Sequence, residues 1–463
     1  MPGWDCHGLP IEWKIEEQYK KKKKNKDDVP IKDFRKECRD FAKSWIDVHI
    51  KEFQRLGVVG DFENYYSTMS YEAEAQIVRE LGKFLLDGSL YQGFKPVLWS
   101  TVEKTALADA EVEYLDHTSN TIYVAFKVKE TKNEFLKDTN VIIWTTTPWT
   151  IPGNQAVCAN PEIEYLILDS GSEYFVIASE LLKSCLNRWS DKTYEPTNIS
   201  FKGSELENLK VLHPLYKRET PLLFGDHVTT ETGTGFVHTA PAHGVDDFNV
   251  CSNAEIEVIN PIATNNCYKE DVDFFSGVHV RKVDPLVLEE LQKNNALICQ
   301  ENYHHSYPHC WRHKTPLIFM ATPQWFISMT KSGLLDGANR AIRDVDFIPD
   351  WGKERMEIML KDRPDWCISR QRDWGIPIPL FYDSESGELH PNQDKIFNQA
   401  SEAVKNSGID SWANMDLGVE EKSFEKSKDI FDVWFDSGIT LSLIHISEPT
   451  RQAEISYAVF CLK

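Results

Sequence analysis

The segment that most constrains this chain runs from Val141 to Asn154 and reads VIIWTTTPWTIPGN. Its apolar, β-branched start predicts a buried strand. Pro148 has no N–H to donate to a central ladder, so the strand must end or bulge there. A plain threonine-rich strand edge would have a similar composition, because threonine favours strands. The segment therefore predicts a row of hydroxyl groups at a strand end, with Thr150 and Asn154 one turn further on.

A second segment with unusual spacing is GTGFVHTAPAHGVDD, residues 233–247. Val237 belongs to a predicted strand, which places His238 at the strand end, and a proline and a glycine then turn the chain. Asp246 and Asp247 open a predicted helix, where carboxylates suit the positive end of the helix dipole. Taken alone, each of these features is more often structural than functional. Their pairing with the threonine segment is what indicates a site.

The predicted secondary structure changes along the chain. Amphipathic helices are predicted from Phe34 to Leu56 and from Tyr71 to Asp87, each ended by a glycine. Short β-type runs begin near Thr118, and residues 227–230 and 235–239 read as a hairpin. These changes divide the chain into four parts. Residues 1–117 hold connecting helices, 118–302 form a β-rich insertion, and 303–438 return to a mixed α/β pattern. Residues 439–463 form a tail whose sequence does not fit the part before it.

Together the two segments resemble the editing-domain signature of the class I aminoacyl-tRNA synthetases for isoleucine, valine and leucine. The resemblance implies a hydrolytic pocket lined by Thr145, Thr146, Thr147, Thr150 and Asn154. It implies that Asp247 holds the ammonium group of a misattached amino acid. It also implies that His238 shapes the pocket so that valine fits and isoleucine does not.

Two further segments favour the isoleucine branch of this family. Residues 3–12 read GWDCHGLPIE, and residues 363–379 read RPDWCISRQRDWGIPIP. The first resembles the loop after the first crossover of the class I nucleotide-binding fold, with Asp5 facing the ammonium group of the amino acid.

The second segment implies substrate contacts for Gln371 and Trp374. Trp434, in DVWFDSG, would close an aliphatic pocket with Trp374, because two indoles make a rigid apolar slot. Core packing is the alternative interpretation of both tryptophans.

The resemblance implies an α/β fold: a Rossmann-like class I core, incomplete here, with an inserted β-rich editing domain. In the parent protein it implies ATP-dependent attachment of isoleucine to tRNA(Ile), with Mg²⁺ accompanying ATP, and hydrolysis of Val-tRNA(Ile). Isoleucine and valine differ by one methylene, worth about 1–3 kcal/mol in an apolar pocket, a magnitude described for this class of enzymes. A monomer in the bacterial cytoplasm, or in mitochondria for a eukaryotic source, is expected. A valine or leucine ligase and an inactive tRNA-binding fragment are the alternatives.

The resemblance covers residues 2–438, so we expect a fragment. The His-x-Gly-His and Lys-Met-Ser-Lys-Ser signatures that handle phosphates in this class do not occur in the sequence. The chain by itself is therefore not expected to form the adenylate. Residues 439–463 resemble translated sequencing-adapter DNA, and we expect them to be non-native.

Charge and cysteine content narrow the remaining possibilities. The net charge is −21, so tRNA binding requires a local basic groove. No apolar run is long enough to span a membrane. The cysteines form no Cys-x-x-Cys pair, which suits a reduced compartment. Cys310 and His313 give only two of the four ligands of a structural zinc site, so no metal is predicted.

Overall fold

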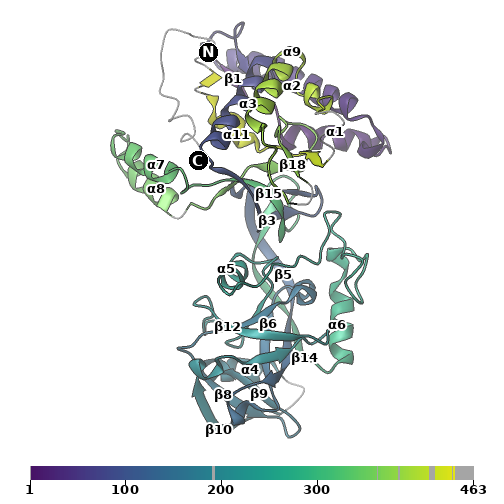
Figure 1. Ribbon diagram of the computed structural model, residues 1–463, viewed down its shortest axis with the longest axis vertical. Coiled ribbons are helices and arrows are strands. Elements are labelled where there is room, and N and C mark those ends of the chain that lie inside the picture. Colours follow the sequence, from purple (N-terminus) through teal and green to yellow (C-terminus); the bar gives the residue numbers. More distant parts are fainter. Residues whose placement is uncertain are drawn as a thin grey trace. The chain divides into compact units, whose positions relative to one another are not determined.

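The computed structural model describes residues 2–189, 193–361, 363–383, 386–416, 423–440 and 442–443. The chain forms two compact units, residues 1–93 with 324–463, and residues 94–323 (Figure 1). It passes from one unit to the other within two strands, β3 (Leu90–Ser100) and β15 (Ile318–Ile327). The predicted insertion, 118–302, lies inside the second unit.

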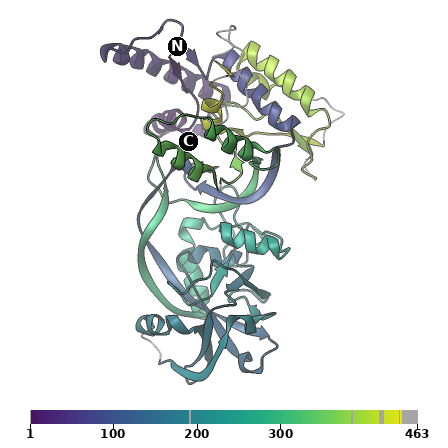
Figure 2. The same cartoon turned by 90° about the vertical axis from the view of Figure 1, so that its left-hand side faces the viewer.

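The first unit is mainly helical. Its helices are α1 (Leu9–Lys21), α2 (Ile31–Arg55), α3 (Tyr71–Leu86), α7 (Leu334–Arg343), α8 (Trp351–Lys361), α9 (Gln393–Ser407), α10 (Asp410–Ala413) and α11 (Val433–Gly438). Helix α3 packs against α9 (Figure 2). At this contact, Ser401 Oγ donates to the carbonyl of Ala75 at 3.2 Å. Both predicted helices of this region are confirmed, and Gly57 and Gly88 follow them with positive φ.

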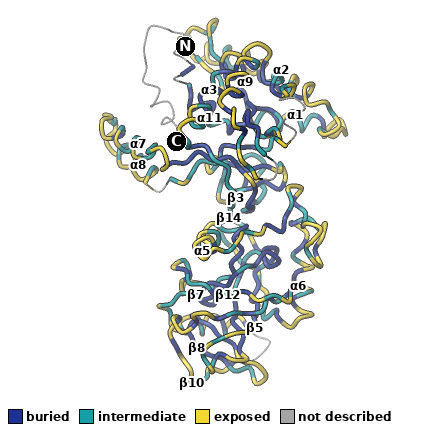
Figure 3. Tube along the Cα trace, viewed as in Figure 1, coloured by how far each residue is buried: buried dark blue, intermediate teal, exposed yellow. Residues whose placement is uncertain are grey.

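Helix α2 carries both buried and exposed positions along its length (Figure 3). Its core face is Phe34, Cys38, Ala42 and Ile46. Trp45 and Phe53, which also fit the apolar spacing, are 46% and 41% exposed. The sequence carries two apolar stripes on this helix, and periodicity alone does not tell which of them the neighbouring elements cover.

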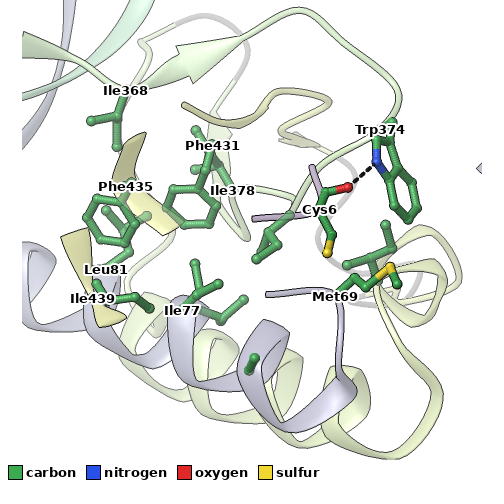
Figure 4. Packing of buried hydrophobic residues seen from close by; sticks show 14 of the residues in the cluster. Cys6, Met69, Ile77, Leu81, Ile368, Trp374, Ile378, Phe431, Phe435 and Ile439 are labelled. Carbon is green, nitrogen blue, oxygen red and sulfur yellow. Dashed lines mark hydrogen bonds between the residues drawn. The ribbon is translucent and has the colours of Figure 1, made fainter. Parts of the chain in front are cut away.

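Short strands join distant parts of the first unit. They are β1 (Gly3–Trp4), β2 (Tyr66–Ser67), β16 (Trp366–Cys367), β17 (Ser369–Arg370), β18 (Phe381–Asp383), β19 (Phe424–Lys426) and β20 (Ile430–Phe431). Strand β1 pairs with β2 in parallel, and β17 pairs with β20 in antiparallel. The apolar core of this unit includes Cys6, Trp374 and Phe435 (Figure 4).

The second unit is built on one large mixed sheet. The strands of this sheet are β5 (Val112–Glu130), β6 (Thr139–Thr145), β7 (Ala156–Ala159), β8 (Glu164–Asp169), β9 (Tyr174–Ala178), β10 (Glu195–Lys202), β11 (Lys210–Leu212), β12 (Glu219–Phe224), β13 (Val237–Thr239) and β14 (Leu297–Cys310). Strand β4 (Thr105–Ala106) instead pairs with β3, in a four-stranded sheet with β15 and β16. The helices of the second unit are α4 (Leu182–Arg188), α5 (Val245–Asn253) and α6 (Asp284–Lys293). The pairing β6–β13–β7–β12–β11–β5 returns to β6 and closes a ring.

The predicted hairpin in the second unit is wrong. Only Val237–Thr239 forms a strand, and it pairs with β6 in parallel and with β7 in antiparallel. Gly233 and Gly235 adopt positive φ because the chain passes close to other segments there. A Cβ at Gly235 would lie 2.4 Å from the Cβ of Ala178. These glycines therefore allow a close approach of the backbone rather than a two-residue turn.

The fold is the mixed α/β class that was predicted, with a helical part and a β-rich part. Most of the predicted non-native tail, 439–463, lies outside the described residues. Ile439 and Leu443 are described, and both pack in the core of the first unit. Among the described residues, no helix has the length and apolarity needed to cross a membrane.

Candidate active sites

The threonine segment forms a chain of hydroxyl groups at the end of β6. Pro148 opens a short 3₁₀ helix, η4 (Pro148–Gly153), which turns Thr150 back toward the strand end. Thr147 Oγ1 lies 3.2 Å from Thr145 Oγ1 and 3.1 Å from Thr150 Oγ1. The Thr150 hydroxyl donates to the carbonyl of Thr147 at 2.7 Å. The predicted gathering of hydroxyls is thus present, and η4 is the element that produces it.

His238 extends this chain from β13. Its Nε2 lies 2.9 Å from Thr150 Oγ1, and its Nδ1 lies 2.8 Å from Asn154 Nδ2. The amide nitrogen of Asn154 also donates to the carbonyl of Ala156 at 2.7 Å, which fixes the amide orientation. Nδ1 of His238 therefore accepts, and Nε2 carries the proton and donates to Thr150.

This bonding decides what His238 can do. Burial, together with the nearby His243, lowers the pKa of His238 to about 3, so the ring is neutral at physiological pH. Both ring nitrogens already have partners, which leaves no free lone pair to take a proton from water. His238 is consequently suited to shaping a pocket and not to general-base catalysis.

Asp247 stands in the first turn of α5, as predicted. Its Oδ2 accepts the backbone N–H of Ala240 at 2.8 Å, which holds the carboxylate against the segment that follows β13. Burial raises the pKa of Asp247 to about 6, while that N–H and His227 lower it. The group is therefore ionised at neutral pH. Its neighbour Asp246 is exposed.

Thr146 differs from the other predicted pocket residues. It follows Thr145 and is half-buried, but among the described residues it takes no part in the hydroxyl chain. Successive residues in an extended segment point to opposite sides, which accounts for its separation from Thr145 and Thr147.

In the first unit, Asp5 and Gln371 each have defined partners. Asp5 accepts a hydrogen bond from the Ser437 hydroxyl on α11. Gln371 Nε2 lies 3.0 Å from Gln324 Oε1 and 3.2 Å from Asp429 Oδ1. These two acceptors fix the orientation of the Gln371 amide, and neither of them was predicted.

Trp374 is a core residue in this structure. It is fully buried, and its indole N–H donates to the carbonyl of Cys6 at 2.8 Å (Figure 4). Its ring packs on His7, with centroids 5.0 Å apart. The structure therefore agrees with the alternative interpretation, in which Trp374 is a core-packing residue. A ligand can touch the ring only if neighbouring residues move. Trp434, on α11, is half-buried.

Asp432 is a buried hub that was not among the predicted site residues. Its Oδ2 accepts from the Trp366 indole at 3.0 Å and from the Arg370 guanidinium at 2.8 Å. Its Oδ1 caps α11 by accepting the backbone N–H of Trp434 at 3.1 Å. An aspartate before a short helix is an N-cap pattern that sequence inspection could have found. The hub connects the segment 363–379 to α11.

The second unit also holds a cluster of possible metal ligands. Glu103, Cys310 and His313 place one ligand atom each within 4.8 Å of one another. Glu103 therefore adds a third donor to the two that the sequence indicated. Burial lowers the pKa of His313, but Cys310 and Glu103 outweigh it and raise that pKa to about 9. His313 Nε2 lies 3.4 Å from Glu103 Oε1, and the three donors are one fewer than the four ligands of a structural zinc site.

The family model for class I tRNA synthetases (I, L, M and V) matches residues 1–459, so the chain belongs to this family. The isoleucine–tRNA ligase of Pelagibacter ubique is 51% identical over an alignment of 460 residues, which covers 96% of this chain and 51% of the relative. That of Legionella pneumophila strain Paris is 48% identical over an alignment of 453 residues, which covers 95% of this chain and 48% of the relative. The chain thus spans about half the length of these curated relatives.

Proposed function

We propose that this chain is the part of an isoleucine–tRNA ligase that carries the editing site. In the whole protein, isoleucine would be attached to tRNA(Ile) with ATP and Mg²⁺, and Val-tRNA(Ile) would be hydrolysed. The similarity to named isoleucine–tRNA ligases supports the choice of amino acid over valine and leucine. The whole protein would be a monomer in the bacterial cytoplasm.

The hydroxyl chain from Thr145 to His238 is the observation that carries the editing half of the proposal. Hydrolysis of an aminoacyl ester needs a placed water and donors for the oxyanion that develops on the carbonyl. Hydroxyl groups at a strand end can position the water and donate to the oxyanion, so that no covalent nucleophile is needed. Because each hydroxyl is held by its neighbour, the group is preorganised and little reorganisation is needed in the transition state.

Selectivity in this pocket is assigned to His238 and Asp247. Asp247, ionised above its pKa of about 6, would hold the ammonium group of the amino acid. The neutral ring of His238 is fixed at both nitrogens and cannot turn away to admit a longer side chain. A valyl ester would therefore fit where an isoleucyl ester, one methylene larger, meets the ring.

The amino-acid site of the synthetic half is assigned to Asp5, Gln371 and Trp434 in the first unit. Asp5 would meet the ammonium group, and Gln371, oriented by Gln324 and Asp429, would contact the substrate. Trp434 would supply the apolar wall. Trp374 would support this site from the core.

The test uses neighbouring carboxylates on α5. The chain should hydrolyse Val-tRNA(Ile) and spare Ile-tRNA(Ile). Asp247→Ala should lose at least about a hundredfold in rate, because a charge-assisted contact worth about 3 kcal/mol is removed. Asp246→Ala, at the exposed neighbouring position, should retain the rate. Equal loss in both variants, or binding of tRNA without hydrolysis by the wild type, would contradict the assignment.

A further inference from the structure

His7 is enclosed in the first unit and faces two acidic side chains. Its Nδ1 lies 2.9 Å from Oδ2 of Asp436, and its Nε2 lies 3.6 Å from Oε1 of Glu74. The exposed fractions are 5% for His7, 0% for Glu74 and 1% for Asp436. Each ring nitrogen therefore meets a carboxylate oxygen in a site without bulk solvent.

This geometry selects one protonation state. A neutral imidazole has one N–H and one lone pair, and the lone pair would point at a carboxylate. An imidazolium donates from Nδ1 to Asp436 and presents a positive N–H at Nε2 to Glu74, an ion pair at 3.6 Å rather than a hydrogen bond. Burial alone would lower the pKa of His7, but Asp436 and Glu74 outweigh it and raise that pKa to about 9. A histidine whose pKa is raised in this way keeps its proton at neutral pH and loses it only as the pH rises through about 9.

Carboxylates outnumber cations around His7. Asp5 comes from its own loop, Glu74 from α3 and Asp436 from α11, while the nearby cation is Arg39 from α2. Asp432, which acts on Asp436, has its own ion pair with Arg370. Arg39 pairs with Glu74, and His7 pairs with Asp436. A neutral His7 would leave a buried carboxylate without a countercharge, which is costly.

The same contacts attach α11 to the loop after β1. Helix α11 has only 6 residues and cannot be stable by its own hydrogen bonds. Three residues of this loop contact the helix: Ser437 donates to Asp5, Asp436 pairs with His7, and Val433 packs against Gly8. Gly8 has φ +91°, and a Cβ there would lie 3.3 Å from the Cβ of Val433. Trp434 is carried on this helix.

We propose that His7 is an imidazolium held between Glu74 and Asp436, and that this ion triad positions α11 with Trp434 and Asp5. His7 is thus a positioning residue that acts through α11 and does not itself touch the substrate. The charge state of His7 does not depend on the proposed function, whereas the link to isoleucine binding rests on it.

The charge state is tested on the full chain with ¹⁵N-labelled histidine, by correlating ring nitrogens with ring protons. Among the 14 histidines, His7 is assigned as the signal lost in His7→Gln. If that variant does not fold, Glu74→Gln assigns it as the signal that shifts most. Two protonated nitrogens persisting at pH 7.5 would support the triad. A single neutral tautomer at that pH would overturn it.

The positioning role is tested by isoleucine binding, measured by calorimetry. Asp436→Asn should weaken binding by about tenfold or more, and adding His7→Gln should recover most of the loss, because a neutral pair restores the hydrogen bond. Asp410→Asn, which removes an ion pair with Arg35 in the same unit, is the control. Unchanged affinity in Asp436→Asn would overturn the positioning role. A wild type that binds no isoleucine would contradict the proposed amino-acid site, while the ring-nitrogen signals still decide the triad.

Discussion

At the scale of single residues, the proposed editing site depends on the direction of its hydrogen bonds. Asn154 donates to Nδ1 of His238, so Nε2 must donate to Thr150. Each member thus fixes the proton position of the next. The function proposed for the pocket follows from this order more than from the number of threonines.

Replacing Thr150 tests that order. Thr150→Val keeps the shape but leaves the buried Nε2–H of His238 without an acceptor, which should cost about 1–3 kcal/mol of unfolding free energy. Thr150→Ser keeps the hydroxyl and should cost less than about 1 kcal/mol. Urea denaturation followed by tryptophan fluorescence measures both. Equal stability of the two variants would show that the bond to His238 is not formed.

The pKa of Asp247 predicts how editing depends on pH. Because burial raises this pKa to about 6, the carboxylate is present above that pH and is lost as the pH falls through it. The rate of Val-tRNA(Ile) hydrolysis should therefore fall between pH 7 and pH 5.5. Asp247→Ala should show a flat profile over the same range. A wild-type rate that does not change would mean that Asp247 carries no catalytically relevant charge.

At the scale of elements, short pieces are held together by buried polar hubs. Asp432 joins β17, the segment with Trp366 and helix α11 through its two carboxylate oxygens. Asp432→Asn leaves the Arg370 guanidinium without its countercharge and should destabilise the first unit by about 3–5 kcal/mol. Asp410→Asn breaks a partly exposed pair and should cost about 0–1 kcal/mol. Thermal unfolding distinguishes the two, and similar losses would argue against the hub.

The cluster of Glu103, Cys310 and His313 allows a second prediction at this scale, which concerns metal binding. Since these three donors are one fewer than the four ligands of a structural zinc site, dialysis against EDTA should leave the melting temperature unchanged. Elemental analysis should find zinc well below one equivalent, with a sample dialysed without chelator as the reference. One equivalent of zinc, lost together with a drop in melting temperature, would show that water or another group completes a metal site.

Local features could be predicted from the sequence, whereas long-range pairs could not. The helix predicted from Tyr71 to Asp87 is found as Tyr71–Leu86, because its apolar spacing and the glycine that ends it are local signals. His7 and Asp436 are 429 positions apart, and nothing near either residue indicates the other. Which stripe of α2 is buried, and that Trp374 lies in the core, likewise depend on distant neighbours. The roles assigned to the site residues stay predictions.

At the scale of the whole molecule, the second unit should fold by itself. Its interior uses residues on both sides of 118–302: Trp99 and Thr101 bond to the buried amide of Asn266, and the carbonyl of Ala321 accepts from Asn260. Residues 94–323 should therefore unfold cooperatively. A piece of residues 118–302 lacks the hydrogen-bond partners of the buried Asn260 and Asn266 amides. Its free energy of unfolding should therefore be about 2–6 kcal/mol lower than that of residues 94–323. Equal stability of the two pieces would contradict this account.

The central claim is that this chain carries a valine-selective editing pocket. The most direct measurement is the single-turnover hydrolysis rate of Val-tRNA(Ile), compared with Ile-tRNA(Ile) and with Thr-tRNA(Val) under the same conditions. The account predicts rapid hydrolysis of Val-tRNA(Ile), with both other esters spared. Preferential hydrolysis of Thr-tRNA(Val) would assign the pocket to a valine enzyme, and hydrolysis of Ile-tRNA(Ile) at the same rate would contradict the role given to His238.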